Sequence, residues 1–312
     1  MTTRPSDDAT EVTPERLRRI PLPPADERGD KEARGRVLVA GGERENPGAL
    51  LLAGTAALRA GAGKLRLAAP RSIAVALGVA LPEARVFALA ETEGGALSPR
   101  AAAELAELAA HVDAVLLGPG MIDQSSAGPL TRGVLERIEG VAVVLDAGCF
   151  PCLADRRDLL HGLEDRAVLT PHVGEMATLL GIDQDAVAAD PLGVARRAAK
   201  ELRAVVALKG STTYVVDPGG EAYRYDGGAV GLATSGSGDV LAGIVAGLLA
   251  RGAAPLRAAA WGVYLHGEAG NALAAATGRI GYLARELPAE IPPLMERLSG
   301  EHHRSVGFGA RG

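Results

Sequence analysis

The chain has 312 residues, of which 47% are hydrophobic and 23% charged, and its formal net charge at pH 7 is −5. This size and composition predict a globular protein with a large core, while the negative charge and the 3% aromatic content disfavour nucleic-acid binding. No apolar run reaches the roughly 20 residues of a bilayer span, and the polar first 35 residues lack the apolar segment of a secretory signal. We therefore expect a cytoplasmic protein that does not enter the membrane.

Short apolar runs alternate with helical patterns along most of the chain. Residues 1–35 are predicted to form a flexible leader. The predicted strands span 36–42, 64–70, 83–90, 113–117, 141–145, 166–170 and 204–208, followed by a hairpin over 212–227. The predicted helices span 47–63, 99–112, 128–138, 191–202, 239–251, 255–276 and 289–298.

This alternation predicts an α/β fold with a doubly wound, mostly parallel central sheet and helices on both faces. We expect one domain over residues 36–298, without a separate lid domain, and a flexible tail over 299–312. In such sheets the ligand lies at the carboxyl ends of the strands. The glycine-rich and charged turns GGERENPG, GPGM, DAG, TPHVGE and KGSTT all follow predicted strands, so they are expected to meet at one edge.

The segment SGSGDVLAG, residues 235–243, directly precedes a long apolar helix. One interpretation is a simple helix cap, with Ser237 or Asp239 satisfying the first backbone N–H groups. The other is an anion site, in which Gly236 and Gly238 let a phosphate approach the bare amides and Asp239 accepts a proton. A capping aspartate alone does not require glycine on both sides of a serine, so we favour the anion site.

Other motifs are weaker. GGERENPG does not match the dinucleotide fingerprint G-x-G-x-x-G, and GAGKL lacks the glycine spacing and the Ser or Thr of a P-loop. Cys149 and Cys152 are the only two cysteines. They are too few for a structural zinc site, and we expect two unlinked buried thiols rather than a redox pair. His266, in YLHGEAGN, is expected to pack between helices.

Three motifs combine into a more specific pattern: LTPHVGEMATLLG, LKGSTT and SGSGDVLAGIVAGLLARG. Together they resemble the ribokinase-like superfamily, and more specifically the ADP/ATP-dependent (S)-NAD(P)H-hydrate dehydratases. RVLVAGG, the following NPGALLLAGTAALRAGAGKLRLAAP, and VLLGPGM also resemble that family in the same order. The resemblance covers about residues 36–298.

The resemblance implies a carbon–oxygen lyase that repairs NADH and NADPH hydrated at C6 of the nicotinamide ring (NADHX and NADPHX). A nucleotide phosphate, from ADP or ATP with ADP favoured, would phosphorylate the ring hydroxyl, and phosphate would then be eliminated. Asp239 would be the general base. The amides of Gly236, Ser237 and Gly238 would stabilise the transferring phosphoryl group.

The resemblance also assigns further residues. His172, Gly120 and Ala49, with Asp239, are expected to contact the substrate. Glu175 is expected to organise Mg²⁺, mostly through water, and Asp146 is a candidate for the same edge. The nucleotide-binding positions are expected to be Lys209, Gly210, Ser211, Thr212, Thr213 and Gly238. For His172, Gly120 and Ala49 a purely structural role is the alternative.

The chain departs from the family pattern at three places. Asp146-Ala147-Gly148 stands where the family commonly has Asp-Ala-Asp, so a second carboxylate is missing. Val173 replaces a proline, and Ser235 replaces a glycine. By resemblance we also expect a homotetramer and a separate epimerase acting on the same substrate.

Two other functions remain open. A kinase of a small alcohol, such as hydroxyethylthiazole or a sugar, shares the fold and the G-x-G-D motif. A nucleotide-binding sensor without catalysis is the second alternative.

Overall fold

A ten-stranded sheet forms the centre of the computed structural model, which describes residues 8–24, 34–163 and 165–299. Its strands follow the order β1-β10-β9-β8-β7-β6-β5-β2-β3-β4. The strands are β1 (Thr10–Glu11), β2 (Arg36–Ala40), β3 (Lys64–Pro70), β4 (Ala84–Leu89), β5 (Ala114–Leu117), β6 (Ala142–Leu145), β7 (Ala167–Leu169), β8 (Val205–Leu208), β9 (Thr213–Val216) and β10 (Ala222–Tyr225).

The seven strands from β4 to β8 are all parallel, and only β8–β9 and β9–β10 pair antiparallel. β2 and β5 are buried almost completely, because helices cover both of their faces. From β2 to β4, successive strands are added on one side of β2, whereas β5 to β8 are added on its other side, so the strand order reverses between β2 and β5. The predicted fold class is therefore confirmed.

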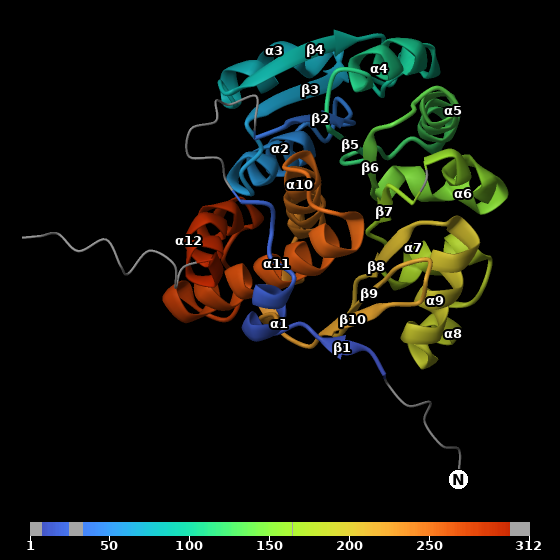
Figure 1. Ribbon diagram of the computed structural model, residues 1–312. Helices are drawn as coiled ribbons and strands as arrows, with labels where there is room; N and C mark the ends of the chain where they lie inside the picture. The colour runs from blue at the N-terminus through green and yellow to red at the C-terminus, as the bar shows by residue number, and fades with distance from the viewer. Residues whose placement is uncertain (1–7, 25–33, 164, 300–312) are drawn as a thin grey trace, which may run out of the picture.

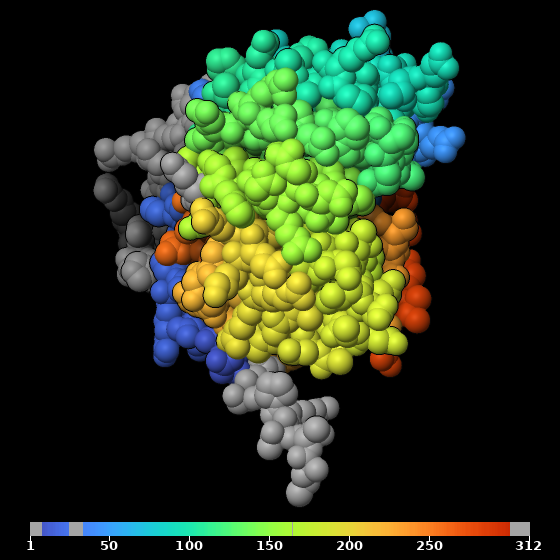
Figure 2. Space-filling view, turned by 90° about the vertical axis from the view of Figure 1, so that its right-hand side faces the viewer, coloured from blue at the N-terminus to red at the C-terminus, as the bar shows by residue number. Residues whose placement is uncertain are grey.

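Two sets of helices cover the sheet (Figure 1). Buried residues of the first set join one core cluster: α1 (Pro14–Arg19), α2 (Gly48–Arg59), α3 (Arg71–Ala80), α10 (Ser237–Ala250), α11 (Pro255–Thr277) and α12 (Leu287–Ser299). The second set packs on the other face, which Figure 2 shows: α4 (Ala102–Ala109), α5 (Gln124–Leu135), α6 (Phe150–Asp155), α7 (Val173–Leu180), α8 (Gln184–Ala189) and α9 (Pro191–Leu202).

α10 is the innermost helix. Twelve of its residues are buried, because it packs against α2, α11 and the sheet at the same time. Methyl groups added at Gly243 and Gly247 would lie 2.2 Å from the Ala53 carbonyl oxygen and 2.4 Å from the Ala57 carbonyl oxygen. These glycines therefore let α10 and α2 pack closely against each other.

The described part of the predicted leader differs from the prediction. Residues 10–11 form β1 beside β10, and α1 follows, with Leu17 completely buried and Val12 nearly so. The sequence pattern missed this because the partners of these side chains lie more than 200 residues away. The predicted tail after Ser299 lies outside the described residues. Within the described ranges, no helix combines the length and the apolar character that a bilayer crossing needs.

Candidate functional site

The loops that follow the parallel strands meet at the carboxyl edge of the sheet, as predicted. Gly42, after β2, donates its N–H to the carbonyl oxygen of Pro119, after β5, over 2.7 Å. The loop after β7 pairs with the end of β8 through the Lys209 N–H, which donates to the Pro171 carbonyl oxygen over 2.8 Å. These bonds connect the loop after β2 with the loop after β5, and the loop after β7 with the end of β8.

The N-terminus of α10 opens into this site. Gly236, the N-cap residue, has a left-handed backbone with φ 84°, and no side chain caps the helix. The Ser237 N–H donates to the Thr234 carbonyl oxygen over 3.2 Å. Within the described residues, the N–H groups of Gly238 and Asp239 have no protein acceptor, so they are available for an anion at the positive end of the helix.

Lys209, at the end of β8, does not extend into solvent. Its Nζ lies 3.2 Å from Asp146 Oδ1 and 3.8 Å from Glu175 Oε2. It is also 3.4 Å from the position that a Gly238 methyl group would take. The ammonium thus lies between the carboxylates and the open amides of α10, where it can attract a phosphate.

Asp146 is the most buried carboxylate of this group, with a side chain 4% exposed. It accepts a hydrogen bond from the Thr170 hydroxyl over 2.7 Å as well as the bond from Lys209. Both partners come from neighbouring parallel strands, and they fix the carboxylate in one orientation. Burial of Lys209 acts to lower its pKa, but the attraction of Asp146 and then of Glu175 outweighs this effect and raises the pKa. The lysine therefore stays charged.

The pKa of Asp239 is strongly shifted. Burial, and after it the charge of Asp146, raises its pKa from 3.8 to about 7, while Lys209 opposes the rise. Burial also raises the pKa of Glu175. A carboxyl group with a pKa near 7 is well matched to take a proton at neutral pH.

His172 and Glu175 form the beginning of α7. The Nδ1 atom of His172 accepts from the N–H groups of Gly174 and Glu175 over 3.0 and 3.3 Å, and Glu175 Oε2 accepts from the His172 N–H over 2.7 Å. This reciprocal cap is a structural role. The His172 side chain is nevertheless 59% exposed, with Nε2 3.5 Å from Glu175 Oε1, so its outer edge can still reach a ligand.

Ala49 and Gly120 lie together on the other side of the carboxyl edge. A methyl group at Gly120 would lie 2.9 Å from both the Ala49 Cβ and the Asn46 carbonyl oxygen, and the residue has φ 70°. Glu43 holds the loop beyond Gly120, because its carboxylate accepts the N–H groups of Ile122 and Asp123 over 2.5 and 2.6 Å. The small residues thus close the gap between two strand ends.

The loop between β8 and β9 places the remaining predicted nucleotide contacts. Gly210 and Ser211 are exposed. Thr212 Oγ1 donates to Asp226 Oδ1 over 2.7 Å, and Thr213 opens β9. This loop therefore leads from Lys209 toward the segment that precedes α10.

The donor set suits a magnesium ion held through water. In the described part of the chain, no three His, Cys, Asp or Glu side chains converge closely enough to bind a metal directly. Glu175, beside Lys209, and Asp239, in the first turn of α10, are partly exposed carboxylates, and Mg²⁺ keeps several waters when carboxylates and phosphates bind it. The residues therefore fit an ion that arrives with a nucleotide.

Two side chains of the site had no distinctive sequence signal. Thr170 contacts Asp146, as described above. His266, on α11, packs between helices as predicted, and in addition its Nε2 lies 2.9 Å from Ser237 Oγ. Cys149 and Cys152 are buried and unlinked, and burial raises the pKa of the Cys152 thiol to about 11.

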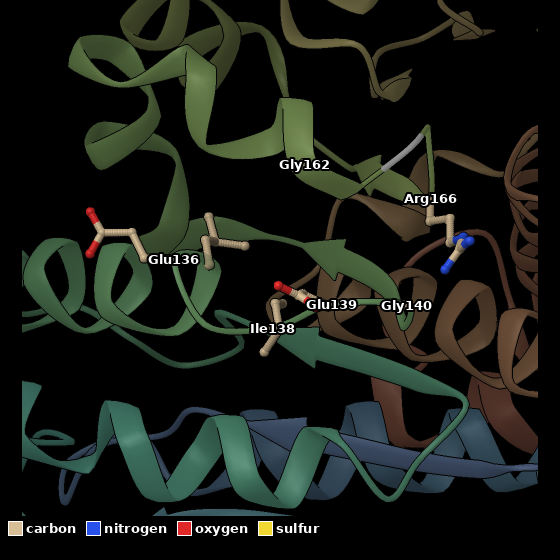
Figure 3. Close-up of a pocket in the computed structure, with 7 residues that line it drawn as sticks. Glu136, Ile138, Glu139, Gly140, Gly162 and Arg166 are labelled. Atoms are coloured by element: carbon tan, nitrogen blue, oxygen red, sulfur yellow. The ribbon is translucent and has the colours of Figure 1, made fainter.

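A recess of about 550 Å³ lies elsewhere, between the loops that precede β6 and β7 (Figure 3). Its wall includes Glu139, Gly140 and Arg166. These residues stand at the amino ends of the strands, on the edge opposite to Asp239. The recess is therefore separate from the site described above.

Comparisons with known proteins agree with this geometry. Residues 37–293 match the family described as NAD(P)H-hydrate dehydratase. The chain is 46% identical over 287 residues to an ADP-dependent (S)-NAD(P)H-hydrate dehydratase of Xanthomonas campestris, covering 92% of this chain and 96% of the relative. It is 40% identical to a bifunctional NAD(P)H-hydrate repair enzyme of Moorella thermoacetica, covering 93% of this chain and 55% of the relative.

Among solved structures, an ADP/ATP-dependent NAD(P)H-hydrate dehydratase from Bacillus subtilis, co-crystallized with ATP/Mg²⁺, matches with a TM-score of 0.79. It is 28% identical, and the match covers 94% of this chain and 100% of that one. A hydroxyethylthiazole kinase from Pyrococcus horikoshii, 20% identical with a TM-score of 0.56, shares the fold.

Proposed function

The chain belongs to the NAD(P)H-hydrate dehydratase family, and we propose that Asp239, the open amides of α10 and Lys209 carry out its nucleotide-dependent dehydration of NADHX and NADPHX. ADP is the preferred phosphoryl donor, since the most similar relative named above is ADP-dependent. One observation carries the assignment of residues. Asp239, whose pKa is raised to about 7, stands in the first turn of α10 beside two unpaired amides and within the field of Lys209.

The first step is phosphorylation of the ring hydroxyl at C6. Asp239 takes the hydroxyl proton, and the oxygen attacks the terminal phosphorus of ADP while the bond to the AMP oxygen breaks. The N–H groups of Gly238 and Asp239 and the Lys209 ammonium stabilise the negative charge on the phosphoryl oxygens. Of the three amides predicted for this role, the Ser237 N–H is bonded to Thr234 instead. We therefore assign the hole to the N–H groups of Gly238 and Asp239, and Gly236 to the left-handed N-cap that precedes them.

The second step is elimination. Phosphate is a better leaving group than hydroxide, and the ring nitrogen lone pair assists its departure from C6. Loss of a proton from the neighbouring ring carbon restores the double bond and hence NADH or NADPH. Ala49 and Gly120, which close the gap between two strand ends, would form one wall of the substrate site, while the exposed edge of His172 contacts the substrate.

Magnesium would be held by Glu175 and the nucleotide phosphates, mostly through water, and would neutralise the phosphate charge. Lys209 supplies the positive charge that belongs to the protein itself. Asp146 bonds to Lys209 and is held in turn by Thr170. Glu175 has a second task, because it also caps α7 and thereby orients His172.

The test mixes the protein with NADHX and either ADP or ATP, and follows the dihydronicotinamide absorbance together with phosphate release. Recovery of absorbance with one phosphate per turnover is expected, faster with ADP. A stable phosphorylated product would indicate a kinase of a small alcohol instead. Nucleotide binding without turnover, unchanged in Asp239→Asn, would indicate a sensor.

A further inference from the structure

A half-buried histidine contacts the first residue of α10. His266 lies in the middle of α11, the helix that packs against α10, and its Nε2 is 2.9 Å from the hydroxyl oxygen of Ser237. Ser237 is the first residue of α10 and is 6% exposed. The contact joins two residues that are 29 positions apart in the sequence, one on each of two packed helices.

The Ser237 hydroxyl has no other role in the helix. A serine at a helix start ordinarily caps the helix with its side chain, but here no side chain accepts from the first amides. Within the described residues, its hydrogen-bond partner is His266. The serine is therefore placed for a contact between helices rather than for a cap.

The turn needs such an anchor because of its composition. Gly236 and Gly238 flank Ser237, and glycine gives the backbone more freedom than any other residue. Ser237 is thus the one residue of this three-residue turn whose side chain can fix it. Its neighbours in the turn are free of side chains where the phosphate must approach.

The imidazole is suited to a fixed role. Burial lowers the pKa of His266 to about 4, so the ring is neutral over the physiological range and does not bring a second positive charge beside Lys209. A neutral ring makes one hydrogen bond to the hydroxyl in either tautomer.

We propose that His266 is a positioning residue, which holds Ser237 and thereby directs the amides of Gly238 and Asp239 at the reacting phosphoryl group and the Asp239 carboxylate at the substrate hydroxyl. It does not touch the substrate. This inference rests on the proposed function, since it concerns how that site is held. A misplacement of catalytic groups by about 1 Å costs on the order of 100-fold in rate, which sets the scale of the expected effect.

The test compares three variants with the wild type. His266→Leu removes the hydrogen bond and keeps the site filled, His266→Gln keeps a polar group that can bond Ser237, and Ser237→Ala removes the other partner. We expect kcat to fall about 10- to 100-fold in His266→Leu, with little change in KM for ADP, and to be largely recovered in His266→Gln. His161→Leu, at an exposed histidine that contacts the Glu201 carbonyl oxygen, is the matched control and should keep wild-type activity.

The double variant separates positioning from general loss of stability. If the two side chains act through one contact, His266→Leu combined with Ser237→Ala loses no more activity than the more damaging single variant. The proposal would be overturned if the activity losses of the two single variants multiplied in the double variant. A folded His266→Leu protein with the wild-type kcat would also overturn it.

A second measurement does not depend on activity. Hydrogen exchange of the peptide around α10's start reports the Ser237 and Val240 amides, which are bonded to Thr234 and Gly236. Their exchange should accelerate in His266→Leu, but not in His266→Gln or His161→Leu. If exchange accelerates while the wild type fails to dehydrate NADHX, the anchor stands and the proposed function is wrong. Unchanged exchange would contradict the anchor itself.

Discussion

Replacing Asp239 with asparagine should remove catalysis and stabilise the protein. The asparagine has the same shape but carries no charge, so it relieves the cost of keeping a buried carboxylate beside Asp146 and Glu175. The difference between a pKa of 3.8 and one of about 7 corresponds to about 4 kcal/mol. Since the side chain is partly exposed to solvent, screening reduces the expected gain to about 2 kcal/mol.

The stability gained by Asp239→Asn over the wild type should increase with pH. A carboxyl group with a higher pKa in the folded state binds more protons when folded, so wild-type stability falls as pH rises from about 3.8 to about 7 and then stays level. The asparagine variant lacks this loss. At about pH 8 its Tm should exceed that of the wild type by roughly 4 °C, and the two values should converge toward about pH 4.

The assay is thermal unfolding of both proteins across this pH range, with dehydration of NADHX measured on the same samples. Turnover of the variant should fall by about 10²- to 10⁴-fold. A variant that is less stable than the wild type at about pH 8, or whose Tm difference does not change with pH, would refute the electrostatic reasoning.

Three further outcomes follow from the same geometry. In Asp146→Asn, the acidic limb of the pH–rate profile should move to lower pH, since Asp146 raises the pKa of Asp239 and also holds Lys209; a move to higher pH contradicts this. Gly238→Ala should weaken ADP binding about tenfold by placing a methyl group beside Lys209 Nζ, while thermal stability is kept, because alanine favours a helix; unchanged calorimetric affinity would argue against phosphate at these amides. Both cysteines should react slowly with a thiol reagent in the native protein and fully after unfolding, because they are buried; fast native labelling would contradict this.

Much of the fold could be predicted from local patterns. β3 and α9 were predicted with the bounds that the structure has, because β3 is an apolar run bounded by a charged residue and a proline, and α9 begins at a proline and has a strong amphipathic pattern. α3 was missed. Its sequence RSIAVALGVA follows β3 without a capping residue and contains a glycine, and Val75 and Val79 are exposed, so no amphipathic period marks it.

The candidate site was predictable only where one segment carried the information. SGSGD indicated the amides and Asp239 directly, and the order of turns after parallel strands predicted where they would meet. The edge shared by Asp146, Glu175 and Lys209 was thus predicted, but the hydrogen bond between Lys209 and Asp146, 63 residues apart, was not, because it depends on how their side chains are oriented. The contact between His266 and Ser237 likewise depends on how α10 and α11 pack.

The most direct measurement of the central claim is the single-turnover rate of ADP-dependent NADHX dehydration as a function of pH, for the wild type and Asp239→Asn. The account predicts that the wild-type rate rises tenfold per pH unit below pH about 7 and levels off above it, as the Asp239 carboxylate forms. The Asp239→Asn variant should show a low residual rate that does not rise with pH in this range. A variant that keeps the wild-type rate and the same pH dependence would show that another group takes the proton.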